Sequence, residues 1–324
     1  MNAELEALVL NETHSTEICQ TIHIQDLWSG YGVIEKIALA GGDYNSVIVK
    51  HIKAPNQSNH PRGWNSDLSH RRKINSYQVE CNWYENYSGL CTDSHRIPQL
   101  IAKKEMESEF MLILEDLDDS GYEKRCYELD QKGIASCLMW LASFHANFLN
   151  TNPKGLWDHG CYWHLETRPD ELEVLTDKTL IKAAPIWDHQ LNNAKYKTLV
   201  HGDAKTANFC FSSDLERVSA VDFQYVGAGC GMKDVAYFMS SCLDEDACVK
   251  NEGQILEQYF TYLKSACAEN SANVNFSELE EEWRTLYPIA WCDFLRFLKG
   301  WSPGHWKVNN YSQKMLKIAL SKIK

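Results

Sequence analysis

The residues whose types and spacing are best suited to chemistry lie between positions 197 and 224. The stretch His201-Gly-Asp-Ala-Lys-Thr-Ala-Asn208 combines an acid, a base and an amide, and Val221-Asp-Phe-Gln224 adds a second acid after one short loop. Each stretch adjoins a short strand-like run, at Lys197–Val200 and at Val218–Val221. Transfer of a phosphoryl group to an alcohol needs such a set, because one group must accept the hydroxyl proton while others hold a metal ion against the triphosphate.

The spacing suggests a separate task for each of these side chains. Asp203 is placed to act as the catalytic base, and Lys205 would offset the negative charge that grows in the transition state. Asn208 and Asp222 suit a shared Mg²⁺, which prefers hard oxygen ligands and takes only one or two of them from protein. Taken singly, each residue also suits a turn or a helix cap. The prediction therefore rests on the joint spacing, which matches the protein-kinase pattern His-Arg-Asp-Leu-x-x-x-Asn with Gly in place of Arg.

The same chemistry makes an independent demand on the first third of the chain. A bound nucleoside triphosphate needs a lysine on the third strand of a sheet, paired with a glutamate from the following helix. The stretch Val47-Ile-Val-Lys50 supplies the lysine. Glu80 is the favoured partner because it lies nearer the middle of the expected helix, and Glu85 is the rival.

Backbone groups are expected to supply the other nucleotide contacts. Gly30 and Gly32, in Ser29-Gly-Tyr-Gly32, would let the backbone approach the phosphates closely, although a plain hairpin turn explains this pair about as well. The stretch Met111–Leu117, which includes Glu115, lies where the connection between two lobes should run. Its backbone N–H and C=O groups would bind the edge of the adenine.

Hydrophobic periodicity predicts an α+β protein in which a β-rich part precedes a helical part. Alternating residues predict an antiparallel meander of three strands, over residues 21–28, 33–39 and 46–52. A loop at 54–67 and a polar helix at about 69–87 follow, and then two more strands at 98–102 and 110–114. Helical spacing dominates afterwards, near residues 129–150, 171–184, 232–243, 252–268 and 277–299. We therefore expect a nucleotide-binding lobe over residues 1–116 and a catalytic, acceptor-binding lobe over residues 117–324.

Composition excludes some classes of partner and environment. A net charge of −12 argues against nucleic acid as the main partner, and the short basic run His70–Lys73 is interpreted as a solvated helix face. The most apolar run, Ala135–Leu149, is interrupted by polar residues, so no membrane span is expected. Twelve cysteines without a Cys-x-x-Cys pair, and a segment Met1–Leu10 without basic residues, predict a cytoplasmic protein.

At this point the sequence resembles the aminoglycoside phosphotransferase and choline kinase branch of the protein-kinase-like superfamily, and most closely the ecdysteroid kinase-like group, including its bacterial members. The segments that carry the resemblance span nearly the whole chain and are Leu27–Gly32, Ile48–Lys50, Tyr77–Glu80, Leu114–Leu117, His201–Asn208, Val221–Gln224, Asp234–Tyr237 and Arg296–Trp301. The resemblance implies a two-lobed protein-kinase-like fold with ATP and Mg²⁺ in a cleft lined by Lys50, Glu80 and Asp222. It also implies that Asp203 is the base and that Asp234 supports the catalytic loop.

The short segment after Asp222 indicates what kind of acceptor to expect. A protein kinase needs an activation segment ending in Ala-Pro-Glu, and there is neither room nor a motif for one between Asp222 and Asp234. Gln224 also stands where protein kinases carry Gly, which argues against a flip of this loop as a switch. We therefore expect a small-molecule hydroxyl acceptor. A catalytically silent nucleotide-binding scaffold of the same fold is the alternative.

Three segments of the second lobe mix aromatic residues with histidines and are candidates for the acceptor pocket. They are Gly160–Leu165, Trp187–His189 and Trp301–Trp306. A broad aromatic surface would suit a steroid-like or aromatic alcohol, whereas a choline-like cation would need an aromatic cage with a nearby acid. Packing in the core is the competing explanation for most of these rings. The acceptor, the choice between ATP and GTP, and the oligomeric state stay open.

Overall fold

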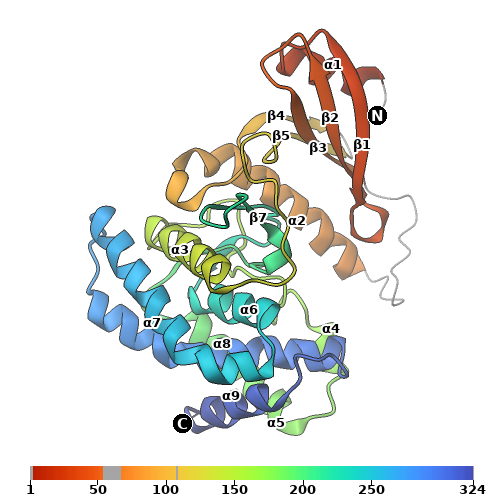
Figure 1. Cartoon of the computed structure of the whole chain (residues 1–324). Helices are drawn as coiled ribbons and strands as arrows, with labels where there is room; N and C mark the ends of the chain where they lie inside the picture. The colour runs from red at the N-terminus through yellow and green to blue at the C-terminus, as the bar shows by residue number, and fades with distance from the viewer. Residues whose placement is uncertain (1–2, 54–66, 107–108, 324) are drawn as a thin grey trace.

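The computed structural model describes residues 3–53, 67–106 and 109–323 (Figure 1). The predicted loop at 54–67 lies outside the described residues up to position 66, and Asp67 already begins a helix. As predicted, the chain combines an N-terminal antiparallel sheet with a C-terminal part that is mostly helical. Figure 1 shows the sheet at one end of the molecule and the later helices, α7 to α9, gathered at the other.

The N-terminal sheet has five antiparallel strands in the order β1-β2-β3-β5-β4. The strands are β1 (Glu17–Asp26), β2 (Gly32–Ala40), β3 (Ser46–Lys53), β4 (Leu100–Met106) and β5 (Glu109–Glu115). The meander of β1 to β3 is confirmed, except that its first strand starts earlier than predicted and ends at Asp26. Because β3 pairs with both β2 and β5, Lys50 lies in the middle of the sheet.

Two helices flank this sheet. The predicted polar helix is α2 (Asp67–Asn86), which follows β3. A short helix, α1 (Ala3–Glu12), was not predicted; its buried Leu5 and Val9 pack with Ile37 and Val47 of the sheet. Leu8 and Leu10 are only partly buried against the same cluster, and a helix of ten residues is marginal by itself, so α1 depends on the sheet for its stability.

The helical part is built from α3 (Gln131–Asn147), the single turn α4 (Asp170–Glu173), α5 (Lys178–Asn192), α6 (Met232–Cys242), α7 (Glu245–Glu269), α8 (Phe276–Trp301) and α9 (Asn310–Ser321). Helix α8 packs against α5, α6 and α9, and α7 packs against α3. The single helix predicted at 171–184 is wrong. Asp177 caps a new helix there, since its carboxylate accepts the backbone N–H groups of Thr179 and Leu180.

Two small sheets hold the motifs that the sequence singled out. Strand β6 (Thr198–Val200) pairs with β9 (Gly227–Gly229), and β7 (Phe209–Phe211) pairs with β8 (Val218–Ala220). The loop 201–208 therefore runs from one small sheet to the other, and Asp222 lies just after β8. Strands β6 and β8 were predicted, whereas β7 and β9 are three residues each and too short for a periodicity signal.

Within the described ranges, no helix is long and apolar enough to cross a bilayer. All twelve cysteines lie in those ranges and all are free thiols, most of them buried.

Candidate active site

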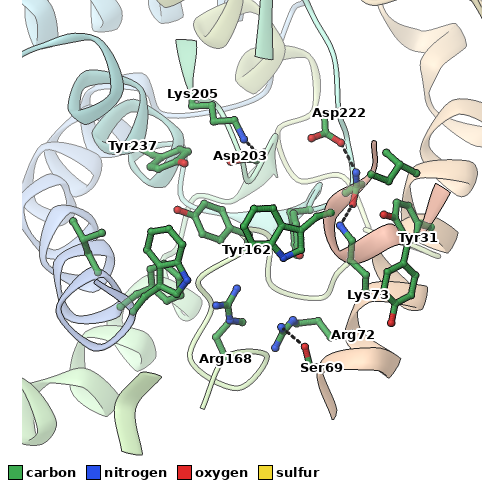
Figure 2. Close-up of a pocket in the computed structure, with 18 of the residues that line it drawn as sticks. Tyr31, Ser69, Arg72, Lys73, Tyr162, Arg168, Asp203, Lys205, Asp222 and Tyr237 are labelled. Carbon is green, nitrogen blue, oxygen red and sulfur yellow. Dashed lines mark hydrogen bonds and ion pairs between the residues drawn. The ribbon is translucent and has the colours of Figure 1, made fainter. Parts of the chain in front are cut away.

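A cavity of about 550 Å³ lies where the sheet-bearing lobe meets the helical lobe. The turn after β1 and the first half of α2 line it from one side, and the loops after β6 and β8 and the end of α8 line it from the other. Figure 2 shows Asp203 and Lys205 on one wall, Asp222 and Lys73 on another, and Tyr162 between them.

Lys50 connects two segments that are far apart in the sequence. Its Nζ atom lies 2.6 Å from Oε2 of Glu80 on α2 and 3.3 Å from Oδ1 of Asp222. Burial opposes the charge on Lys50, but attraction to Glu80 and Asp222 outweighs this effect and raises its pKa. The rival glutamate, Glu85, instead pairs with Lys103 on the surface. The structure thus brings Lys50, Glu80 and Asp222 together as the sequence required.

The loop between β6 and β7 presents Asp203 to the cavity. Lys205 Nζ lies 2.9 Å from Asp203 Oδ2, and attraction to Asp203 is the main reason why the pKa of Lys205 is raised to about 12. The side-chain amide of Asn208 donates to the same carboxylate oxygen at 3.0 Å and to the backbone oxygen of Asp203 at 2.8 Å. Asp203 is therefore held in place with a permanent positive charge beside it.

The backbone of this loop is held by groups behind it. Gly202 has φ +79°, and a Cβ atom there would lie 2.1 Å from the backbone oxygen of Tyr225, so this position of the loop requires glycine. The buried carboxylate of Asp234, on α6, accepts the backbone N–H groups of His201 at 2.6 Å and Gly202 at 2.9 Å. The supporting role that the resemblance implied for Asp234 is thereby confirmed.

The donor atoms near Asp222 fit a magnesium ion. The Asn208 amide nitrogen is engaged by Asp203, so its oxygen is the atom available for a cation, and the backbone of Asn208 accepts the N–H of Val221 at 2.9 Å. Asp222 itself has φ +70° and is braced by Gln224, whose Nε2 donates to Oδ1 at 2.6 Å. One carboxylate and one amide oxygen match what Mg²⁺ takes from protein. The described residues contain no cluster of three or more His, Cys, Asp or Glu side chains suited to a metal.

The glycine turn and Glu115 lie differently with respect to the cavity. Gly30 and Gly32 have φ +74° and +131°, and a Cβ on Gly32 would lie 2.0 Å from the backbone oxygen of His51. Their neighbours Leu27, Trp28 and Tyr31 line the cavity. Glu115 does not line it, because its carboxylate forms an ion pair with Arg96 at 2.5 Å. Its side chain is therefore not brought together with the other predicted site residues.

The interpretation of His70–Lys73 as a solvated helix face is wrong for three of its four residues. His70, Arg72 and Lys73 line the cavity, and only Arg71 is exposed. Lys73 Nζ donates to Oε1 of Gln224 at 2.9 Å and lies 4.6 Å from the centre of the Tyr77 ring. Positions 73, 77 and 80 share one face of a helix. The position of Lys73 on the same face as Glu80 was therefore the sequence signal that could have identified it.

The far end of the cavity is largely aromatic. Its wall is formed by Tyr162, Tyr237, Phe294, Phe297 and Trp301, with His305 beside them. Two of the three candidate acceptor segments, 160–165 and 301–306, thus contribute to the cavity. The third, 187–189, does not, because Trp187 faces inward from α5 and packs in the core.

Lys307 is a further cation at this end that the sequence did not single out. Its Nζ lies 5.3 Å from the centre of the Tyr237 ring and 5.5 Å from that of Phe294, and no described carboxylate is within ion-pair distance. Burial lowers its pKa to about 8. Holding this charge in the folded protein therefore costs stability.

We expect Lys307→Met to raise the melting temperature at pH 7. The pKa of Lys307 is lower in the folded chain than its usual value of 10.5, so the folded protein carries the full cost of the charge below pH 8. The wild type regains stability as pH rises from 8 to 10.5, because its lysine loses the proton in that window only when folded. The difference in melting temperature between variant and wild type should shrink across this range, as thermal unfolding can measure. A difference that stays constant would contradict the prediction.

Comparisons with known proteins support the same view of this fold. Three solved structures match over most of both chains, each with a TM-score of 0.50. An aminopropanol kinase associated with a microcompartment is 12% identical, with 98% of this chain and 94% of that chain covered. The GDP complex of aminoglycoside 2′-phosphotransferase-IIIa is 10% identical, covering 98% and 97%, and an ethanolamine kinase from Plasmodium vivax is 11% identical, covering 94% and 83%. A search of curated proteins gave no match.

The chain therefore has the two-lobed protein-kinase-like fold of these structures. Residues 161–271 match the model of the ecdysteroid kinase-like family. The matched segment contains Asp203, Asn208, Asp222 and Asp234. Both the predicted fold and the predicted resemblance are confirmed.

Proposed function

We propose that this protein is a small-molecule kinase that transfers the γ-phosphoryl group of ATP to a hydroxyl group of its acceptor. The observation that carries the proposal is the contact of Lys50 with both Glu80 and Asp222. This contact brings together strand β3, helix α2 and the stretch Val221–Gln224. A nucleotide-phosphate site of this superfamily requires that arrangement. We further propose residues 1–116 as the nucleotide-binding lobe and residues 117–324 as the catalytic and acceptor-binding lobe.

The proposal gives each side chain of the site a defined task. Asp203 accepts the proton of the attacking hydroxyl, and Lys205 offsets the charge that develops on the transferred group. Lys50 binds phosphate oxygens while Glu80 orients it, and the backbone at Gly30 and Gly32 covers the phosphates. Asn208 and Asp222 would hold Mg²⁺, which supplies further neutralisation of phosphate charge. Glu115 would contribute only through its backbone, since its carboxylate is bound to Arg96.

A silent nucleotide-binding scaffold is the second candidate. Such a protein keeps the fold but loses catalytic side chains. Here the acid, both oxygen ligands and the lysine–glutamate pair are all present: Asp203 and Asp222 line the cavity, Lys50 and Glu80 join Asp222 behind its wall, and Asn208 is bonded to Asp203. This completeness favours the enzyme.

The proposal is tested by incubating the protein with Mg²⁺, a metabolite extract and ATP labelled with ¹⁸O in its γ-phosphoryl group. Mass spectrometry should then find an extract component that has gained the labelled group. Asp222→Asn should abolish this transfer and the Mg²⁺-dependent rise in melting temperature with ATP, because the only carboxylate assigned to the metal is lost. A variant that keeps both properties would overturn the assignment. Mg²⁺-dependent ATP binding by the wild type without any transfer would favour the scaffold.

A further inference from the structure

The charges on the acceptor side of the cavity are unevenly distributed. Besides Lys205 and Lys73, which lie near Asp203 and Gln224, the lining contains Arg72, Arg168 and Lys307 as cations. Among the described lining residues, the acids apart from Asp203 and Asp222, which have tasks of their own, reduce to Asp26, which is exposed at the end of β1. An amine or quaternary ammonium group would therefore meet like charge beside Arg72, Arg168 and Lys307, with no buried acid assigned to pair with it.

Arg72 and Arg168 approach one another from the two lobes. Figure 2 shows both guanidinium groups on the opposite side of Tyr162 from Lys205. Arg72 donates to the Thr167 backbone oxygen at 3.2 Å and to Ser69 Oγ at 3.1 Å, and both of these partners are neutral. Burial and the nearby charge of Arg168 lower the pKa of Arg72. Two neighbouring guanidinium groups repel each other, and an anion between them would remove that repulsion.

Only one of the two arginines has a carboxylate to balance it. Arg168 pairs through its Nε atom with the buried Glu171 at 2.9 Å and lies 4.8 Å from the centre of the Phe297 ring. Arg72 has no carboxylate within ion-pair distance among the described residues. The guanidinium group of Arg72 is thus available to donate to an anion bound in the cavity. The neighbouring part of the cavity wall is aromatic.

We propose that the acceptor is an alcohol with an anionic group on an apolar or aromatic body. This inference rests on the proposed kinase function and specifies its substrate class. The anionic group binds at Arg72 and Arg168, the body lies against Tyr162 and Phe297, and the hydroxyl points toward Asp203. Lys307, half-buried over aromatic rings, adds positive potential to the same region.

The test uses alcohols of one skeleton that carry a negative, a neutral or a positive group at the same position. One set is 4-(hydroxymethyl)benzoate, 4-(hydroxymethyl)benzamide and 4-(aminomethyl)benzyl alcohol, and a second set carries the same groups on biphenyl to span a longer distance. In steady-state assays with Mg–ATP, the more active of the two carboxylates should have a kcat/KM about 10- to 100-fold above that of the carboxamide with the same skeleton. A charge-assisted hydrogen-bond pair provides a difference of this size. The amines should be the poorest acceptors.

Arg72→Gln should remove the preference for the carboxylate, with little change in the KM for ATP. Arg71→Gln is the matched control, since Arg71 is on the same helix but exposed and outside the cavity lining. A preference that survives Arg72→Gln would overturn the inference. So would a rise in the KM for ATP alone, because Arg72 would then serve the nucleotide.

The wild-type results separate failure of this inference from failure of the proposed function. If Mg–ATP binds and extract components are phosphorylated, but carboxamides or amines react as well as carboxylates, the kinase assignment stands and the anionic acceptor is wrong. The same conclusion follows if such an active protein turns over none of the six probes. If neither the extract nor any probe gains a phosphoryl group, the proposed function itself fails.

Discussion

Asp203→Asn is expected to lower kcat by about 10²- to 10⁴-fold, the contribution typical of a positioned general base. The amide has nearly the shape of the carboxylate and can still accept a hydrogen bond from Lys205, which lies 2.9 Å from the native oxygen. It cannot accept the proton of the acceptor hydroxyl at neutral pH. The loss should therefore appear in kcat, with the KM for ATP nearly unchanged.

The measurement is steady-state transfer to an acceptor found in the extract screen, together with ATP binding by the same protein. Asp246→Asn is the matched control, because Asp246 is an exposed acid in the first turn of α7 and does not line the cavity. Its kcat should equal that of the wild type. A fall of less than about tenfold in Asp203→Asn would rule out Asp203 as the base.

Lys50→Met is expected to destabilise the fold by about 3–5 kcal/mol, the usual cost of breaking a buried ion pair from one side. Glu80 is 1% exposed, and burial raises its pKa even with Lys50 at 2.6 Å, so without this partner it must either hold an unpaired buried charge or take up a proton, and both cost stability. The double variant Lys50→Met/Glu80→Gln removes both charges, so it should recover most of the lost stability. It should not recover ATP binding, since the amine that we propose to bind the phosphates is still missing.

Urea unfolding of the wild type, the two single variants and the double variant gives the coupling between positions 50 and 80 directly. ATP-induced shifts in melting temperature on the same four proteins report nucleotide binding. If the double variant is no more stable than Lys50→Met, the pair is not the stabilising contact that the geometry indicates. If it binds ATP as tightly as the wild type, Lys50 has no role in holding the nucleotide.

Stability and function make opposite demands on the cations of this cavity. Burial lowers the pKa of both Lys73 and Lys307 to about 8, so each charge is held at a cost to the folded state. Neither lysine has a carboxylate within ion-pair distance in the described ranges. Groups kept under such conditions are more often maintained for binding than for stability. This pattern is consistent with a cavity that receives phosphates at one end and an anionic acceptor at the other.

The sequence alone was sufficient for the local part of the site. Asp203, Lys205 and Asn208 lie in one short loop between two strands, so their mutual geometry depends on a few backbone angles and can be inferred from spacing. The same holds for Lys50 on its strand and for the antiparallel meander around it.

Only the tertiary structure decided which faces meet across the two lobes. It decided between Glu80, which the sequence favoured, and its rival Glu85, because these positions point in different directions around α2 and only Glu80 pairs with Lys50. It also turned Arg72 and Lys73 into the cavity, where the sequence indicated a solvated face. Such contacts join residues far apart in the chain, as for Lys73 and Gln224. They depend on how the two lobes pack. That packing is determined by burial and charge summed over residues distant in the sequence, so a local sequence pattern cannot predict it.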